Sequence, residues 1–95
     1  MDWQTPPPDF RAVEFQRVNP ARNEARYYYL AWQPTLFGEN VVVRAWGHKG
    51  GQRRHLVRPF ASLEDAWPVI RHLIRRRLKR GYSLITPATY QVKDE

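Results

Sequence analysis

A strand-forming run that ends in a tryptophan and a glycine-rich turn constrains the fold of this chain more than any other segment. The run is VVVRAW, residues 41–46, and the turn that follows is GHKGG, residues 47–51. β-Branched and aromatic residues favour strands, and glycines permit the positive φ angles of tight turns. The segment predicts one strand of an antiparallel pair whose partner is residues 52–58.

Alternation within the run assigns its side chains to two faces of a sheet, because successive side chains in a strand point to opposite sides. One face is wholly apolar and is predicted to be core: Val41, Val43 and Ala45. The other face carries Val42, Arg44 and Trp46, with His48 and Lys49 following at once. This second face is predicted to be an aromatic and cationic edge that need not be buried.

The remaining pattern predicts an α+β fold, an antiparallel β-sheet with one α-helix packed across it. Residues 13–18 and 26–32 have strand composition, and residues 82–85 form a final strand or packing segment. Apolar residues at helical spacing predict a helix from about residue 63–66 to 80 that lies on the sheet. These residues are Ala66, Trp67, Ile70, Leu73, Ile74 and Leu78.

The helix has two possible starts because Pro68 lacks the donor that an interior helical residue needs. Ser62 can cap the helix, with Glu64 and Asp65 complementing its positive end. Alternatively, Asp65 is the cap and Pro68 lies in the opening turn. Gly81 is placed to end the helix in the left-handed conformation.

Ninety-five residues are enough for one domain with one modest core. The predicted division is a flexible Pro-rich arm at 1–10, a domain at 11–86 and a C-terminal tail at 87–95. There is no cysteine, which excludes disulfides and thiolate metal sites. No run approaches the length of a membrane span, and the N-terminus lacks signal-peptide features, so a cytoplasmic protein is expected.

The formal charge of +7 is unevenly distributed. Residues 40–93 hold twelve Lys or Arg and two acidic residues, a balance of +10, and the remainder balances to −3. Six of the basic residues fall within 71–80 and repel one another unless a polyanion or counterions intervene. Such a field favours a polyanionic partner, most often nucleic acid; the alternative is a charge that serves solubility alone.

Several short motifs stand in a fixed order along the chain. They are Asn19-Pro20 and Asn23, YYYL at 27–30, WGHKGGQ at 46–52, Phe60 and Ser62, Ala66, and RLKRGY at 77–82. By this ordered series the chain resembles a WGR domain, a family named for Trp-Gly-Arg and known in DNA-dependent poly(ADP-ribose) polymerases and in small bacterial proteins. The resemblance implies an antiparallel sheet with a helix on one face.

In the polymerases the module binds DNA ends with its signature tryptophan against the terminal nucleotide, which implies that role for Trp46. Two positions depart from the family pattern. His48 stands where an arginine normally helps to join the DNA end to neighbouring polymerase domains. Ala25 stands where an asparagine often precedes the basic residue, here Arg26, before the paired tyrosines.

Eight residues are candidates for contacting nucleic acid: Trp46, Arg44, His48, Lys49, Arg26, Arg75, Arg76 and Lys79. Stacking of bases on an aromatic ring tolerates any sequence, and cations take the phosphates. The structural alternatives are that Trp46 closes the edge of the core and that the helix cations form a solvated face. Arg77 falls near the apolar side of the helix and is predicted to snorkel over the sheet.

Metal and catalytic interpretations find little support. The spacing of His48, His55 and His72 matches no ligand motif. Ser62 and the acidic pair beside it are explained as helix-start residues. No enzymatic activity, metal or cofactor is predicted. The leading hypothesis is a non-catalytic, sequence-nonspecific module for DNA, at ends or breaks, or for other nucleic acid; the alternative is an adaptor whose basic face docks an acidic protein.

Overall fold

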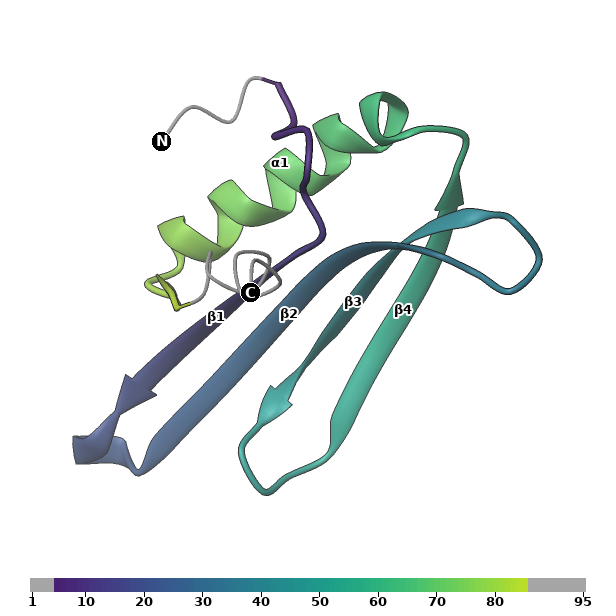
Figure 1. The fold of residues 1–95 in the computed structure, drawn as a ribbon. Coiled ribbons are helices and arrows are strands. Elements are labelled where there is room, and N and C mark those ends of the chain that lie inside the picture. The colour runs from purple at the N-terminus through teal and green to yellow at the C-terminus, as the bar shows by residue number, and fades with distance from the viewer. Residues whose placement is uncertain (1–4, 86–95) are drawn as a thin grey trace, which may run out of the picture.

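A computed structural model describes residues 5–85 and shows one antiparallel sheet with a helix packed across it, the predicted α+β fold (Figure 1). The elements, in chain order, are β1 (Ala12–Asn19), the 3₁₀ turn η1 (Pro20–Arg22), β2 (Glu24–Pro34), β3 (Asn40–His48), β4 (Arg53–Phe60), α1 (Leu63–Lys79) and β5 (Ser83–Leu84). The strand order is β4-β3-β2-β1-β5, and every neighbouring pair is antiparallel. The predicted strands are therefore present: β1, β2 and β3 extend beyond the predicted bounds, β4 begins one residue later and ends two residues later than predicted, and β5 is shorter than the predicted segment.

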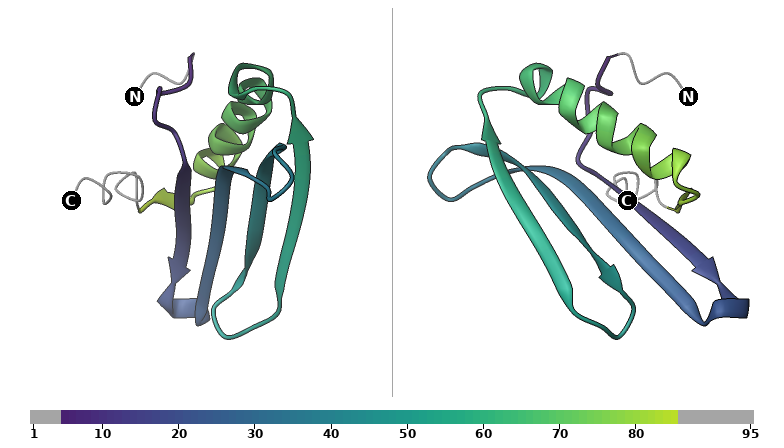
Figure 2. Two further views of the ribbon diagram at one scale, coloured as in Figure 1. Left: turned by 45° about the vertical axis from the view of Figure 1, so that its right-hand side comes forward. Right: turned by 180° about the vertical axis from the view of Figure 1, so that it is seen from behind.

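Helix α1 covers only part of the sheet. It crosses one face near the end where β3 begins, and the strand ends that meet the turns at 20–23 and 49–52 extend past it (Figure 2). Its last turn is tied to β1, because Arg17 donates from Nη1 to the carbonyl oxygen of Arg80 at 3.0 Å. The helix side of the sheet thus has a covered half, which holds the core, and an uncovered half.

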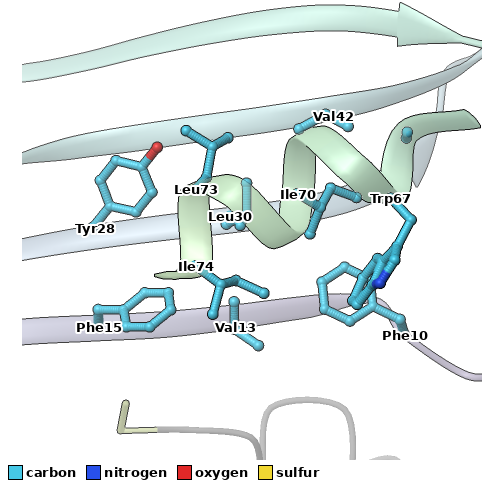
Figure 3. Close-up of a cluster of buried hydrophobic side chains, with 11 residues drawn as sticks. Phe10, Val13, Phe15, Tyr28, Leu30, Val42, Trp67, Ile70, Leu73 and Ile74 are labelled. Atoms are coloured by element: carbon cyan, nitrogen blue, oxygen red, sulfur yellow. The ribbon is translucent and has the colours of Figure 1, made fainter. Parts of the chain in front are cut away.

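The core lies between α1 and the covered half of the sheet (Figure 3). Its largest fully buried side chains are Tyr28, Phe15, Leu30, Ile70, Ile74, Val13 and Val42. Phe10, the last residue of the predicted Pro-rich arm, is also buried and meets Trp67 edge to face, with ring centroids 5.2 Å apart. The arm was predicted to pack loosely, and at Phe10 that prediction is wrong.

The two-face alternation predicted for residues 41–46 is confirmed, and Val41 and Ala45 of the predicted core face are buried, but α1 packs on the other face. Trp46 pairs with Tyr28, and Val42 pairs with Trp32, on the face that α1 covers. Val41 and Ala45 are buried on the opposite, helix-free face, and Val43 there is half-buried. Apolar side chains on both faces satisfy the alternation equally, so the pattern could not show which face the helix would choose.

The start of α1 follows the first of the two predicted alternatives. Ser62 is the N-cap, and its hydroxyl accepts a hydrogen bond from the backbone N–H of Asp65 at 3.1 Å. The alternative with Asp65 as the cap is therefore wrong, and Pro68 lies within the helix. At the other end, Gly81 adopts the predicted left-handed conformation, with φ at 89°.

The apolar stripe of α1 is buried as predicted except at its last member. Ala66, Trp67, Ile70, Leu73 and Ile74 are buried, whereas Leu78 is 43% exposed. Within residues 5–85, no helix combines the length and the apolar character needed to cross a bilayer. The predicted C-terminal tail, residues 87–95, lies outside the described residues.

Candidate functional site

A hollow of about 340 Å³ lies beside Trp46, and we call it the Trp46 hollow. Its lining comes from β2, β3, the turn between β3 and β4, the start of β4, and the segment between α1 and β5: Arg26, Trp46, Gly47, His48, Gln52, Arg54 and Tyr82. The strand register explains this grouping, because Trp46 pairs with Arg54, and Arg26 pairs with His48. Three of the eight predicted site residues, Arg26, Trp46 and His48, therefore meet at one place.

Trp46 forms the aromatic wall of this hollow and is half-buried. Its ring stacks on that of Tyr28, with centroids 6.1 Å apart and an interplanar angle of 28°. Arg44, on the same sheet face, places its guanidinium carbon 5.3 Å from the indole centroid and donates from Nε to the Tyr28 hydroxyl at 2.8 Å. Trp46 therefore packs on the edge of the core and also faces the hollow.

Further arginines surround the aromatic rings beside the hollow. The guanidinium carbon of Arg77 lies 4.4 Å from the Tyr28 centroid and 5.4 Å from the Tyr82 centroid. The guanidinium carbon of Arg17 also lies over the Tyr82 ring, 5.5 Å from its centroid. Arg77 lies over the sheet as predicted, but its Nε does not reach solvent: it is buried with no hydrogen-bond partner among the described residues. The site is accordingly rich in both aromatic surface and positive charge.

One carboxylate offsets part of this charge. Glu24 forms ion pairs with Arg26 and, at 3.3 Å, with Arg17, which face each other across β1 and β2. Hydrogen bonding from Arg26, and less strongly from Arg17, lowers the pKa of Glu24 below its usual value despite partial burial. The stability that this pairing contributes is thus present above pH ~4.5 and is lost as the pH falls through the lowered pKa. At neutral pH the pairing is intact.

Within residues 5–85, Arg44, Arg54 and Arg77 have no carboxylate partner. Positive charge that no carboxylate of the described chain neutralises is available to an anionic ligand.

Gly47, the second residue of the signature, is required by close packing at the turn. A Cβ atom at this position would lie 2.5 Å from the backbone oxygen of Gln52 and 3.3 Å from the Tyr27 hydroxyl. In the same turn Gly50 has a φ of 78°, a left-handed conformation that glycine adopts without the strain that a side chain would cause. The glycines therefore fix the path by which Gln52 and Arg54 reach the hollow.

Replacing Gly47 with alanine is expected to destabilise the domain by about 1–3 kcal/mol, because the new methyl group meets backbone that cannot move freely. Chemical denaturation measures this loss. Gly51→Ala is the matched control in the same turn, since its Cβ would lie 3.3 Å from the Cβ of His48 and its φ is not positive. Equal destabilisation by the two changes would contradict the role assigned to Gly47.

Lys49 does not join the predicted group. It lines a second hollow of about 430 Å³ on the helix-free face of the sheet, together with Tyr27, Tyr29 and Arg53. Burial, and to a smaller extent the charge of Glu14, raises the pKa of Tyr29 there, so its hydroxyl stays protonated at neutral pH. The turn carries Lys49 to the opposite side of the sheet from Trp46.

The three helix cations form a separate surface. Arg75, Arg76 and Lys79 are exposed and line a broad depression of about 760 Å³ along α1. None of them lines the Trp46 hollow. The predicted site is thus divided into a hollow at the uncovered half of the sheet and a cationic helix face.

The three histidines also occupy different surfaces. His48 lines the Trp46 hollow, His72 lies on the cationic helix face, and His55 pairs with Ala45 on the helix-free side. Among residues 5–85, no three His, Asp or Glu side chains come together as a metal-ligand set.

Sequence reasoning did not select four residues of this site as contacts: Gln52, Arg54, Arg77 and Tyr82. Arg54 could have been found by extending the hairpin register, because it is the cross-strand partner of Trp46. Tyr82 is brought to the hollow by the sharp end of α1, where its backbone N–H donates to the carbonyl of Arg77 at 3.0 Å.

The fold and the hollow together define a small binding module. A family model, the WGR domain, matches residues 11–89, and the chain belongs to this family. A WGR domain is a module of nucleic-acid-binding type and is not catalytic in itself.

The comparison with curated proteins adds one relative. The chain is 40% identical over 67 residues to a protein from Sinorhizobium fredii (strain NBRC 101917 / NGR234) named "Uncharacterized protein y4dW". The match covers 70% of this chain and 33% of the relative, so the chain spans about a third of the relative's length. No solved structure matches the chain significantly.

Proposed function

We propose that this WGR domain binds DNA without sequence specificity, and preferentially at ends or breaks, through the Trp46 hollow. Trp46 offers an aromatic surface for the terminal base, and Arg26 and Arg54 take adjacent phosphates. Tyr82 adds a second ring across the hollow. No catalytic step, metal or cofactor is part of this function.

The observation that carries the proposal is that aromatic rings and guanidinium groups meet in one hollow, where Arg54 has no carboxylate partner among residues 5–85. Any base can stack on an aromatic ring, and arginines bind phosphates whatever the sequence. The combination therefore favours nucleic-acid binding without sequence specificity. The lining of the hollow includes residues at the hairpin end of β3 and β4, where the strands extend past α1 (Figure 2). A duplex end can approach there without displacing the core.

Trp46→Ala is expected to weaken binding to a short blunt-ended duplex by about 1–3 kcal/mol, the value typical of a base stacked on an aromatic ring. Fluorescence anisotropy measures the affinity, and thermal unfolding of the same variant measures stability. Because Trp46 also stacks on Tyr28, some stability is lost, and the affinity is corrected for the unfolded fraction.

Trp32→Ala is the matched control. Trp32 is another half-buried tryptophan on the helix side of the sheet, packed against the core and outside the Trp46 hollow. Its truncation should lower stability while leaving the corrected DNA affinity near that of the unmodified protein. Equal losses of affinity in the two variants would remove the stacking role from Trp46.

The preference for ends has its own measurement. Linear and covalently closed circular DNA of the same length and sequence compete for the protein against the labelled duplex. The linear form should compete more strongly, because it alone exposes terminal bases. Equal competition would be consistent with nonspecific DNA binding and would contradict the preference for ends.

A further inference from the structure

Strand β4 is the open edge of the sheet and is exposed along almost its whole length. It stands last in the strand order, and each of its residues except Phe60 is exposed. Among the described residues, its only backbone ladder is the one to β3. The outer backbone groups of β4 are therefore available to another extended chain.

An apolar groove runs along the helix side of this edge. It has a volume of about 250 Å³ and is lined by Val42, Arg44, Leu56, Val57, Arg58, Phe60 and Val69. Leu56 is 53% exposed although it pairs with Arg44 on the face that α1 partly covers. Small-molecule sites have volumes of roughly 300–1,000 Å³, so this groove suits single side chains better than a cofactor.

The charge along β4 has one sign. Arg53, Arg54 and Arg58 accompany His55 on this strand, and no acidic residue interrupts them. Arg58, which lines the groove, lies over the Phe60 ring with its guanidinium carbon 4.9 Å from the ring centroid. Alternate residues of a strand share a face, so Arg54 and Arg58 flank Leu56 on the groove side.

From this edge, groove and charge pattern, we infer that β4 binds an extended acidic segment of a partner protein, which adds to the sheet as an antiparallel strand. One large apolar side chain of the segment enters the groove beside Leu56. Carboxylates two residues before and after it lie beside Arg54 and Arg58. Backbone hydrogen bonds supply affinity, and the alternate side chains supply specificity.

Charge complementarity selects this occupant over a second copy of the chain. Two β4 strands paired edge to edge would bring rows of arginines together, and like charges across strands are destabilising. Edge arginines also commonly serve to prevent unwanted strand pairing. Arginines on the edge disfavour pairing with a cationic or neutral strand, but they favour pairing with an acidic one. Protection against pairing also does not explain why Leu56 is exposed beside an apolar groove.

A display library of random octapeptides, selected against the full chain, tests this inference. Enriched peptides should carry one large apolar residue with Asp or Glu two positions before and after it. For one such peptide, Leu56→Glu is expected to lower the affinity by about tenfold or more, as for an anchor position. Leu56→Ser removes the same side chain without adding charge and should also lower it.

His55→Glu is the matched control, because His55 is also exposed, its register places it on the other face of the same strand, and it does not line the groove. It adds the same charge and should change the affinity by less than about threefold, as for a position outside the anchor. No enrichment, or equal losses in the Leu56 and His55 variants, would overturn the inference. So would a dimer that Leu56→Glu abolishes, or an equal loss of DNA and peptide binding in that variant.

Discussion

Replacing Ile70 with alanine is expected to lower the free energy of unfolding by roughly 2–5 kcal/mol. Ile70 is completely buried in the cluster between α1 and the sheet, so its truncation leaves a cavity that neighbouring side chains fill only in part. Chemical denaturation at constant pH measures the loss. A domain of this size has a small total stability, so the variant should be partly unfolded near body temperature.

Leu78→Ala, on the same helix, is the matched control. Leu78 is 43% exposed, so its truncation should cost far less than that of Ile70. Similar losses in the two variants would mean that α1 does not pack on the sheet through the stripe that contains Ile70.

DNA binding is expected to weaken by about 100- to 1,000-fold between about 50 and 200 mM salt, as neutralising roughly four to six phosphates predicts. In the proposed complex, the arginines of the Trp46 hollow and, where the duplex reaches it, the cationic helix face supply the neutralising charge. A salt series of affinity measurements with a short duplex gives the slope directly. Binding that does not depend on salt would contradict the proposed function.

The slope also tests whether the two cationic surfaces bind the same duplex. Changing Arg75, Arg76 and Lys79 together to serine should reduce the slope of log affinity against log salt by roughly one for each phosphate that the helix no longer neutralises. The matched change is Arg54→Ser within the hollow, which should weaken binding even if the helix surface does not touch the duplex. An unchanged slope in the triple variant would exclude the helix face from the interface.

The main elements of the fold were predictable because their signals are local. Ser62 caps the helix through a bond to a residue three positions along, and the stripe containing Ile70 repeats at helical spacing. Two long-range outcomes were not predictable. Phe10 joins the core only because Trp67 lies opposite it. Val42, and not Val43, lies in the core beneath α1 only because α1 packs on the face of the sheet that carries Val42.

The candidate site was predicted in part, for the same physical reason. Trp46 and His48 adjoin in sequence, and the motif placed them at the turn. Arg54 reaches them through strand pairing, and Tyr82 through the end of the helix, neither of which alternation or spacing reveals. Lys49 shows the converse, since a neighbour in sequence lies on the other side of the sheet.

The division of the sheet into covered and uncovered halves has a consequence for hydrogen exchange. Amides of Leu30 and Val42, beneath α1, should exchange with solvent deuterium only when the whole domain opens. Amides near His48 and Arg53, past the helix, can exchange by local fraying of the hairpin end. A ligand bound beside Trp46 would therefore slow exchange of the amides near the hairpin end, which exchange fastest. Exchange of the amides beneath α1 would keep its rate.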